Sequence, residues 1–111
     1  MMRLAMSPAA AALIRALVAR AAVPRDRVLL IDAESVDWRS LTFNGERHCL
    51  ALRVRGPASS QAVARMCDGL ADAEFSIPGI VVADIALAEP PARSSDGSIE
   101  VSIEALTISE D

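Results

Sequence analysis

The sequence contains no tyrosine, only one histidine and two cysteines, and all of its 11 basic residues are arginine. Aromatic residues make up 3% of the 111 residues, too few for the stacking platforms that bind single-stranded nucleic acid. The net charge of −4 argues against a duplex-binding surface, which needs clustered positive charge. No run approaches the roughly 20 uncharged apolar residues that a membrane span requires.

What the chain has in quantity is apolar side chains, which make up 52% of its residues. Together with the modest net charge, this fraction predicts a folded chain and not a disordered one. The length fits one domain over residues 1–111. The two cysteines have no metal-binding spacing, and the N-terminal segment lacks a convincing cleavage site for secretion. We therefore expect a reducing, cytoplasmic setting.

Hydrophobic periodicity predicts helices at about 8–22 and 60–73 and strands at about 27–34, 46–55, 80–88 and 99–109. Ser7 followed by Pro8 is a typical helix start. The polar stretch 35–45 is interpreted as a loop, and the apolar segment 80–88 as a strand covered on much of both faces. The element order α-β-β-α-β-β predicts an α+β fold, in which two helices pack on one face of a four-stranded antiparallel sheet.

Charge is unevenly distributed along this pattern. Residues 1–56 hold nine arginines and five acidic residues, net +4, whereas residues 57–111 hold two arginines and ten acidic residues, net −8. Strand alternation predicts that the uncovered face of the sheet carries Arg47, Arg53 and Arg55 beside Glu100 and Glu104. Such opposite charges form either two solvated faces of one domain or surfaces through which copies attract one another.

Candidate catalytic residues are few. His48 lies on the apolar face of its predicted strand, which favours a hydrogen-bonded structural histidine over a general base. Cys49 follows it directly, but adjacent strand residues point to opposite faces, so the two cannot form a nucleophilic pair. Cys67 falls in the apolar stripe of the second helix, as a buried structural thiol would. We therefore predict that the protein is not an enzyme.

Metal and cofactor sites are not predicted either. Asp32, Glu34 and Asp37 form an acidic cluster, but the glycine and glutamate that a calcium-binding loop requires are missing from the corresponding positions. The five glycines are dispersed, so no phosphate-binding loop is present. We interpret the three acidic residues as solvated.

Four apolar residues are candidates for partner contact. Trp38 and Phe43, in the predicted loop, either fold back over the core or anchor a partner. Leu106 and Ile108 break the alternation of the last strand, which suggests a bulge or an external apolar contact. The full predicted interface comprises Trp38, Arg39, Phe43, Arg47, Arg53, Arg55, Glu100, Glu104, Leu106 and Ile108.

The segment Asp37-Trp38-Arg39-Ser40-Leu41-Thr42-Phe43-Asn44-Gly45-Glu46-Arg47-His48 is followed by an alternating Leu50, Leu52 and Val54. It resembles the central signature of the tail terminator (tail-completion) family of tailed phages and gene transfer agents. The element order is similar to that family over residues 8–111. The chain departs from the family in its short link between the first helix and the first strand. It also lacks the Pro-Tyr step that often opens that strand.

This resemblance implies a structural, non-catalytic protein that forms a ring, typically hexameric, capping the tail tube and joining tail to head. The implied partners are further copies of the chain, the tail-tube protein and a head-completion protein. DNA would pass through the lumen without specific binding. The implied location is the tail of a phage, prophage or gene-transfer particle, assembled in the bacterial cytoplasm.

Two alternatives from other classes remain. One is a small α+β ligand-binding or accessory module that dimerises through sheet edges, which predicts a discrete apolar pocket. The other is an enzyme that uses His48 with Glu46.

Overall fold

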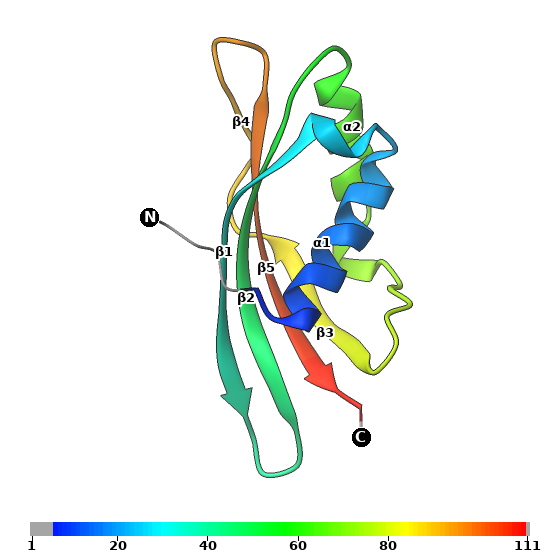
Figure 1. Cartoon of the computed structure of the whole chain (residues 1–111), viewed down its shortest axis with the longest axis vertical. Coiled ribbons are helices and arrows are strands. Elements are labelled where there is room, and N and C mark those ends of the chain that lie inside the picture. Colours follow the sequence, from blue (N-terminus) through cyan, green and yellow to red (C-terminus); the bar gives the residue numbers. More distant parts are fainter. Residues whose placement is uncertain (1–5, 111) are drawn as a thin grey trace.

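The computed structural model describes residues 6–110, which form an antiparallel sheet with both helices on one side (Figure 1). The spatial strand order is β1-β2-β5-β3, and a short strand β4 pairs with β5. The predicted α+β class and the packing of both helices on one face are confirmed. The elements are α1 (Pro8–Ala21), β1 (Val28–Arg39), β2 (Asn44–Val54), α2 (Ser59–Cys67), β3 (Ile80–Leu87), β4 (Ala92–Arg93) and β5 (Ile99–Ser109), with 3₁₀ turns at Arg25–Arg27 and Leu70–Asp72.

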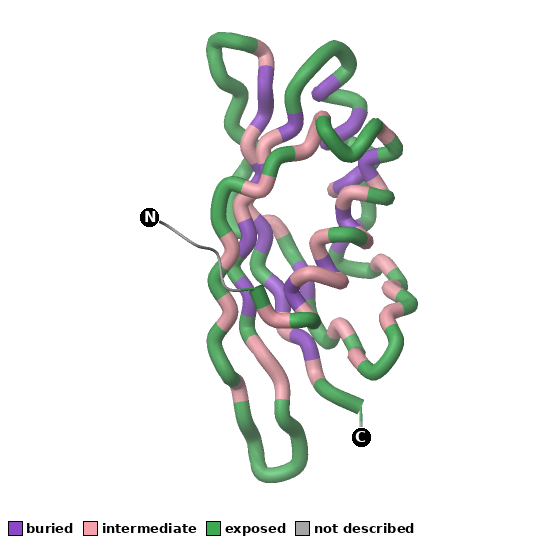
Figure 2. Tube along the Cα trace, in the orientation of Figure 1, coloured by how far each residue is buried: buried purple, intermediate pink, exposed green. Residues whose placement is uncertain are grey.

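The core lies between the helices and the inner face of the sheet (Figure 2). Residues at helical spacing on α1 and α2 pack against alternate residues of β2 and β5, as the periodicity predicts. This burial supplies most of the stabilisation, at about 25 cal/mol for each Å² of apolar surface removed from water. The largest fully buried side chains are Leu13, Leu17, Leu52, Met66, Ile103, His48, Val54 and Val101.

The two helices also satisfy each other's C-terminal carbonyl groups. Arg20 of α1 donates from Nε to the Met66 carbonyl at 2.9 Å, and Arg65 of α2 donates from Nε to the Ala21 carbonyl at 3.0 Å. Carbonyls in the last turn of a helix lack intrahelical donors, and a cation there also interacts favourably with the helix dipole. At the other end of α1, Ser7 accepts a hydrogen bond from the Ala10 amide, as predicted for an N-cap.

The prediction of a loop at 35–45 is wrong, because β1 continues to Arg39 and only residues 40–43 connect it to β2. Each residue of the extension is paired, for example Ser35 with His48 and Trp38 with Gly45. This end of the hairpin projects beyond the helices (Figure 1), so both of its faces can carry polar residues. Its composition therefore looks like that of a loop although its backbone is a strand.

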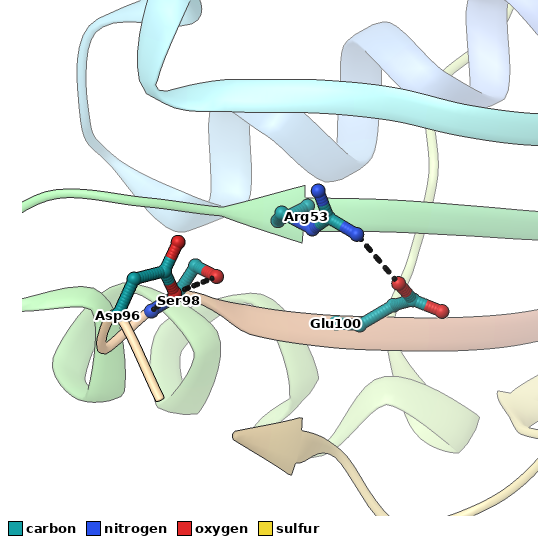
Figure 3. A network of polar contacts seen from close by, with 4 residues as sticks. All are labelled: Arg53, Asp96, Ser98 and Glu100. Atoms are coloured by element: carbon teal, nitrogen blue, oxygen red, sulfur yellow. Dashed lines mark hydrogen bonds and ion pairs between the residues drawn. The ribbon is translucent and has the colours of Figure 1, made fainter. Parts of the chain in front are cut away.

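The predicted count of four strands is also wrong, because β4 adds a fifth between the strands predicted at 80–88 and 99–109. A turn after β4 reverses the chain: the Ser94 amide donates to the Ser98 carbonyl at 2.8 Å, and Gly97 has a φ of +87°. The Asp96 carboxylate accepts from the Ser98 amide and hydroxyl (Figure 3), and these bonds lower the pKa of Asp96. Two residues carry too little alternation to be recognised as a strand in the sequence.

The second helix is shorter than predicted, since α2 ends at Cys67. Gly69 then adopts a φ of +60°, which favours glycine and breaks the helix before the Leu70–Asp72 turn. Ser59 and Ser60 stand at the start of the helix, but neither is its N-cap. Ala58 occupies the cap position, and the Ser59 hydroxyl donates instead to the Gly97 carbonyl at 2.9 Å.

Candidate assembly surface

Within residues 6–110, one face of the sheet carries no helix, and we call it the open face (Figure 1). Strand pairing arranges its side chains in rows across β1, β2, β5 and β3. The row nearest the hairpin consists of Trp38, Gly45, Ile108 and Val81. The next row consists of Val36, Arg47, Leu106 and Asp84.

Five apolar side chains in these two rows form what we call the apolar end of the open face: Val36, Trp38, Val81, Leu106 and Ile108. Val36 is 59% exposed and Val81 is 44% exposed, although both are β-branched residues that usually favour burial. Gly45 lies among these five residues, at a position where an added side chain would collide with the Thr107 carbonyl oxygen. Trp38, Leu106 and Ile108 beside them are partly buried. Apolar side chains gathered in this way on a sheet face are typical of a contact surface.

The alternation of β5 explains the phase break seen in the sequence. The register shifts in the sheet lie in β1, between Leu30 and Asp32, and in β3, between Val82 and Asp84. β5 continues regularly, with Ala105 and Thr107 directed inward. Leu106 and Ile108 are therefore outward-facing residues of a regular strand. No bulge is involved, and their position allows the external apolar contact that was the other prediction.

Charged residues follow the apolar end along the two central strands. Arg53 on β2 and Glu100 on β5 form an ion pair at 3.3 Å (Figure 3). Each is about 40% exposed, so this pair contributes at most about 1 kcal/mol. Arg47 and Glu104 are exposed on the same two strands. The open face thus carries an arginine column on β2 beside a glutamate column on β5, as strand alternation predicts.

The structure separates Arg55 and Arg39 from this surface and places Phe43 at its edge, beside Val81 and Ile108. Arg55 follows the end of β2 and donates from Nη2 to the Asp26 carbonyl at 3.1 Å, which gives it a role within the fold. Arg39 pairs with Asn44 and belongs to the opposite face of the sheet, the face that carries the helices. Phe43 is 55% exposed in the hairpin loop and does not cover the core. Its neighbour Leu41 is fully exposed.

The remaining predicted interface residues come together on the open face: Trp38, Arg47, Arg53, Glu100, Glu104, Leu106 and Ile108. Two depressions lie among them. One of about 210 Å³ is lined by Asp32, Cys49 and Glu104, among others, and one of about 500 Å³ by Phe43, Val81 and Ile108, among others.

The strand β3 is not covered on both faces as predicted. Its outward residues Val81, Asp84 and Ala86 are exposed, whereas Ile85 is buried. The segment is almost continuously apolar in sequence because Val81 and Ala86 stand at outer positions, where Asp84 is the one charged residue. Sequence periodicity therefore missed Val81, and it missed Val36 because that residue lay in the supposed loop.

His48 lies on the inner face and is fully buried, as predicted. Its Nδ1 is 2.7 Å from the Ser35 hydroxyl, and its Nε2 is 2.8 Å from the Thr107 hydroxyl. Burial lowers the pKa of His48, and the nearby Glu46 opposes this shift. Both ring nitrogens are engaged by hydroxyl groups in a closed polar row, so the imidazole has no access to a substrate.

The thiols and acidic residues are distributed over both sides of the sheet. Cys49 is exposed on the open face, opposite to His48, as predicted. Cys67 is half-buried and burial raises its pKa, which Arg20 partly opposes. Asp32, Glu34 and Asp37 are exposed residues of β1 and not of a loop. Within residues 6–110 no three potential ligands gather as a metal site would require.

Comparison with family models, curated proteins and solved structures finds no match to this chain. None of the helices in the described part of the chain has the length and apolarity to cross a membrane.

Proposed function

We propose that this chain is a structural subunit that acts through the open face, and that it is a tail terminator of a phage or gene-transfer particle. In this role it forms a ring, hexameric by the resemblance, at the end of the tail tube. The ring joins the tube to the head through a head-completion protein. In this role the protein catalyses no reaction and acts only by binding its partners.

The observation that carries this proposal is the apolar end of the open face beside two columns of opposite charge. A small domain that worked alone would gain by covering or charging Val36 and Val81, whose exposure costs solubility. The hairpin loop adds Leu41 and Phe43, both exposed at a projecting tip. These features supply apolar residues flanked by charged ones, a combination found at protein interfaces.

Ring closure requires heterologous contacts, in which one surface of a subunit meets a different surface of its neighbour. The charge difference between residues 1–56 and 57–111 suits such contacts, because unlike patches attract. Acidic residues of the second half that line the lumen would repel phosphates, so DNA would slide through without binding. Asp68, Asp72 and Glu74 are exposed candidates for this lining. Replacing them with arginine would retard DNA passage, and unchanged passage would remove the lumen idea.

The test is the mass of the protein with and without the tail-tube protein from the same genome, measured by light scattering after co-expression. We expect a complex in which several copies of this chain sit on the tube protein, and Val36→Asp should abolish it. Arg15→Asp, on the exposed side of α1, is the matched control. If the chain does not bind the tube protein, the result would support the alternative, an accessory module that dimerises through its sheet edges.

A further inference from the structure

The two central strands of the open face are complementary in charge, while β1 and β3 add the acidic residues Asp32, Glu34 and Asp84. β2 and β5 lie side by side at the centre of the sheet, and their outward charges are of opposite sign. A two-fold axis that runs along the strands between them places β2 of one copy over β5 of another. This rotation leaves each row at its own height. In the row nearest the hairpin Trp38 then meets the second copy's Val81, whereas in the next row Val36 meets its Asp84.

We propose that a second copy of this chain covers the open face in the free protein, with this two-fold arrangement. The inference goes beyond the proposed function, because it concerns the protein before it meets any tail component. It explains how exposed residues such as Val36 and Val81 are shielded from water when no tube is present.

The distances suit an aligned pair of sheets, which pack about 10 Å apart. In this arrangement Arg53 lies across from the partner's Glu100. Arg47 lies across from the partner's Leu106, and the partner's Glu104 is one row away, about 7 Å along the strand. An arginine and a glutamate side chain together span this separation.

The charges that would pair are available. Among residues 6–110 neither Arg47 nor Glu104 has an ion-pair partner within 4 Å, whereas Arg53 and Glu100 already pair within one copy. A two-fold interface forms each contact twice, so two Arg47–Glu104 pairs arise from one interface. Charge complementarity of this kind also sets the register of the two copies.

The area available indicates how strong this dimer can be. Four strands and five rows cover about 600 Å² per copy, or about 1,200 Å² for the pair, which is the lower end of specific interfaces. We therefore expect a reversible dimer that dissociates on dilution, not an obligate one.

The experiment is sedimentation velocity over a concentration series with the wild type, Arg47→Glu, Glu104→Arg, and an equimolar mixture of the two variants. Each variant alone should dimerise roughly tenfold more weakly, because like charges then meet. The mixture should recover wild-type affinity. In the mixed dimer the glutamate introduced in one variant faces the arginine introduced in the other, and the unchanged Arg47 faces the unchanged Glu104. Arg15→Glu and Glu74→Arg are controls with the same charge changes at exposed positions outside the open face.

A second readout uses the exposed thiol on this face. In a Cys67→Ser background, the two Cys49 Cα atoms of the proposed dimer lie about 11 Å apart, so a short bis-maleimide should join them. A dimer that cannot be joined in this way would overturn the arrangement.

A monomer at every concentration, a dimer that both charge reversals leave unchanged, or a mixture that does not recover affinity would each overturn the inference. None of these results bears on the ring, which is measured with the tail-tube protein present. Conversely, a dimer that matches all expectations but never binds the tube protein would leave the inference standing and remove the proposed function.

Discussion

The buried row formed by Ser35, His48 and Thr107 makes the folded state sensitive to pH. Burial lowers the pKa of His48 from 6.5, so the folded chain resists a proton that the unfolded chain binds. Stability is therefore fully present above pH 6.5 and falls as the pH drops from 6.5 toward the lowered pKa. The free energy of unfolding should decrease by up to about 1.4 kcal/mol for each pH unit in this window. Urea unfolding at pH 7.5 and 5 measures the change.

The hydrogen bonds of the row predict how variants behave. Thr107→Val leaves a ring nitrogen of His48 buried without a partner, which should cost about 1–3 kcal/mol at pH 7.5. The triple variant Ser35→Ala, His48→Leu, Thr107→Val removes every polar partner together and should cost less than Thr107→Val alone. It should also lack the decline in stability between pH 7.5 and 5, because histidine is the side chain that ordinarily titrates there. Equal pH dependence in the wild type and the triple variant would refute this reasoning.

Three further outcomes are expected. Leu52→Ala should lower the free energy of unfolding by about 2–5 kcal/mol because Leu52 is fully buried, whereas Leu41→Ala should change it by less than about 0.5 kcal/mol; similar losses would contradict the assignment of core and hairpin tip. Arg20→Met should cost about 1–2 kcal/mol in thermal unfolding through its lost bond to the Met66 carbonyl, while Arg15→Met on the same helix should be neutral; a neutral Arg20→Met would show that the bond does not stabilise α2. Maleimide should label Cys49 faster than Cys67, which is half-buried and has a raised pKa; mass spectrometry of timed samples would reveal the opposite order.

Sequence periodicity predicted those parts of the fold that pack against one apolar side. The alternation from His48 to Val54 identified the inner face of β2, and the Ser7-Pro8 start identified α1. Prediction failed where the chain has no core to face. Beyond Ser35, β1 is largely exposed on both faces, so its residues lack the alternation that marks a strand, and β4 is too short to show any.

The candidate site was predicted in part for the same reason. Leu106 and Ile108 were visible because they break an otherwise regular pattern. Val36 and Val81 were not, since their significance lies in the cross-strand register that places them beside Trp38 and Ile108. The hydroxyl partners of His48 are likewise 13 and 59 residues away along the chain, and only strand pairing brings them to the ring.

The most direct test of the open face as the working surface is the alkylation rate of Cys49 in the Cys67→Ser variant, with and without the tail-tube protein. The rate is measured at a protein concentration low enough for the free chain to be monomeric. Binding through the open face predicts that the tube protein slows alkylation severalfold, because Cys49 lies in the middle of that face. An unchanged rate in a complex that demonstrably forms would show that the partner binds elsewhere and would contradict the proposal.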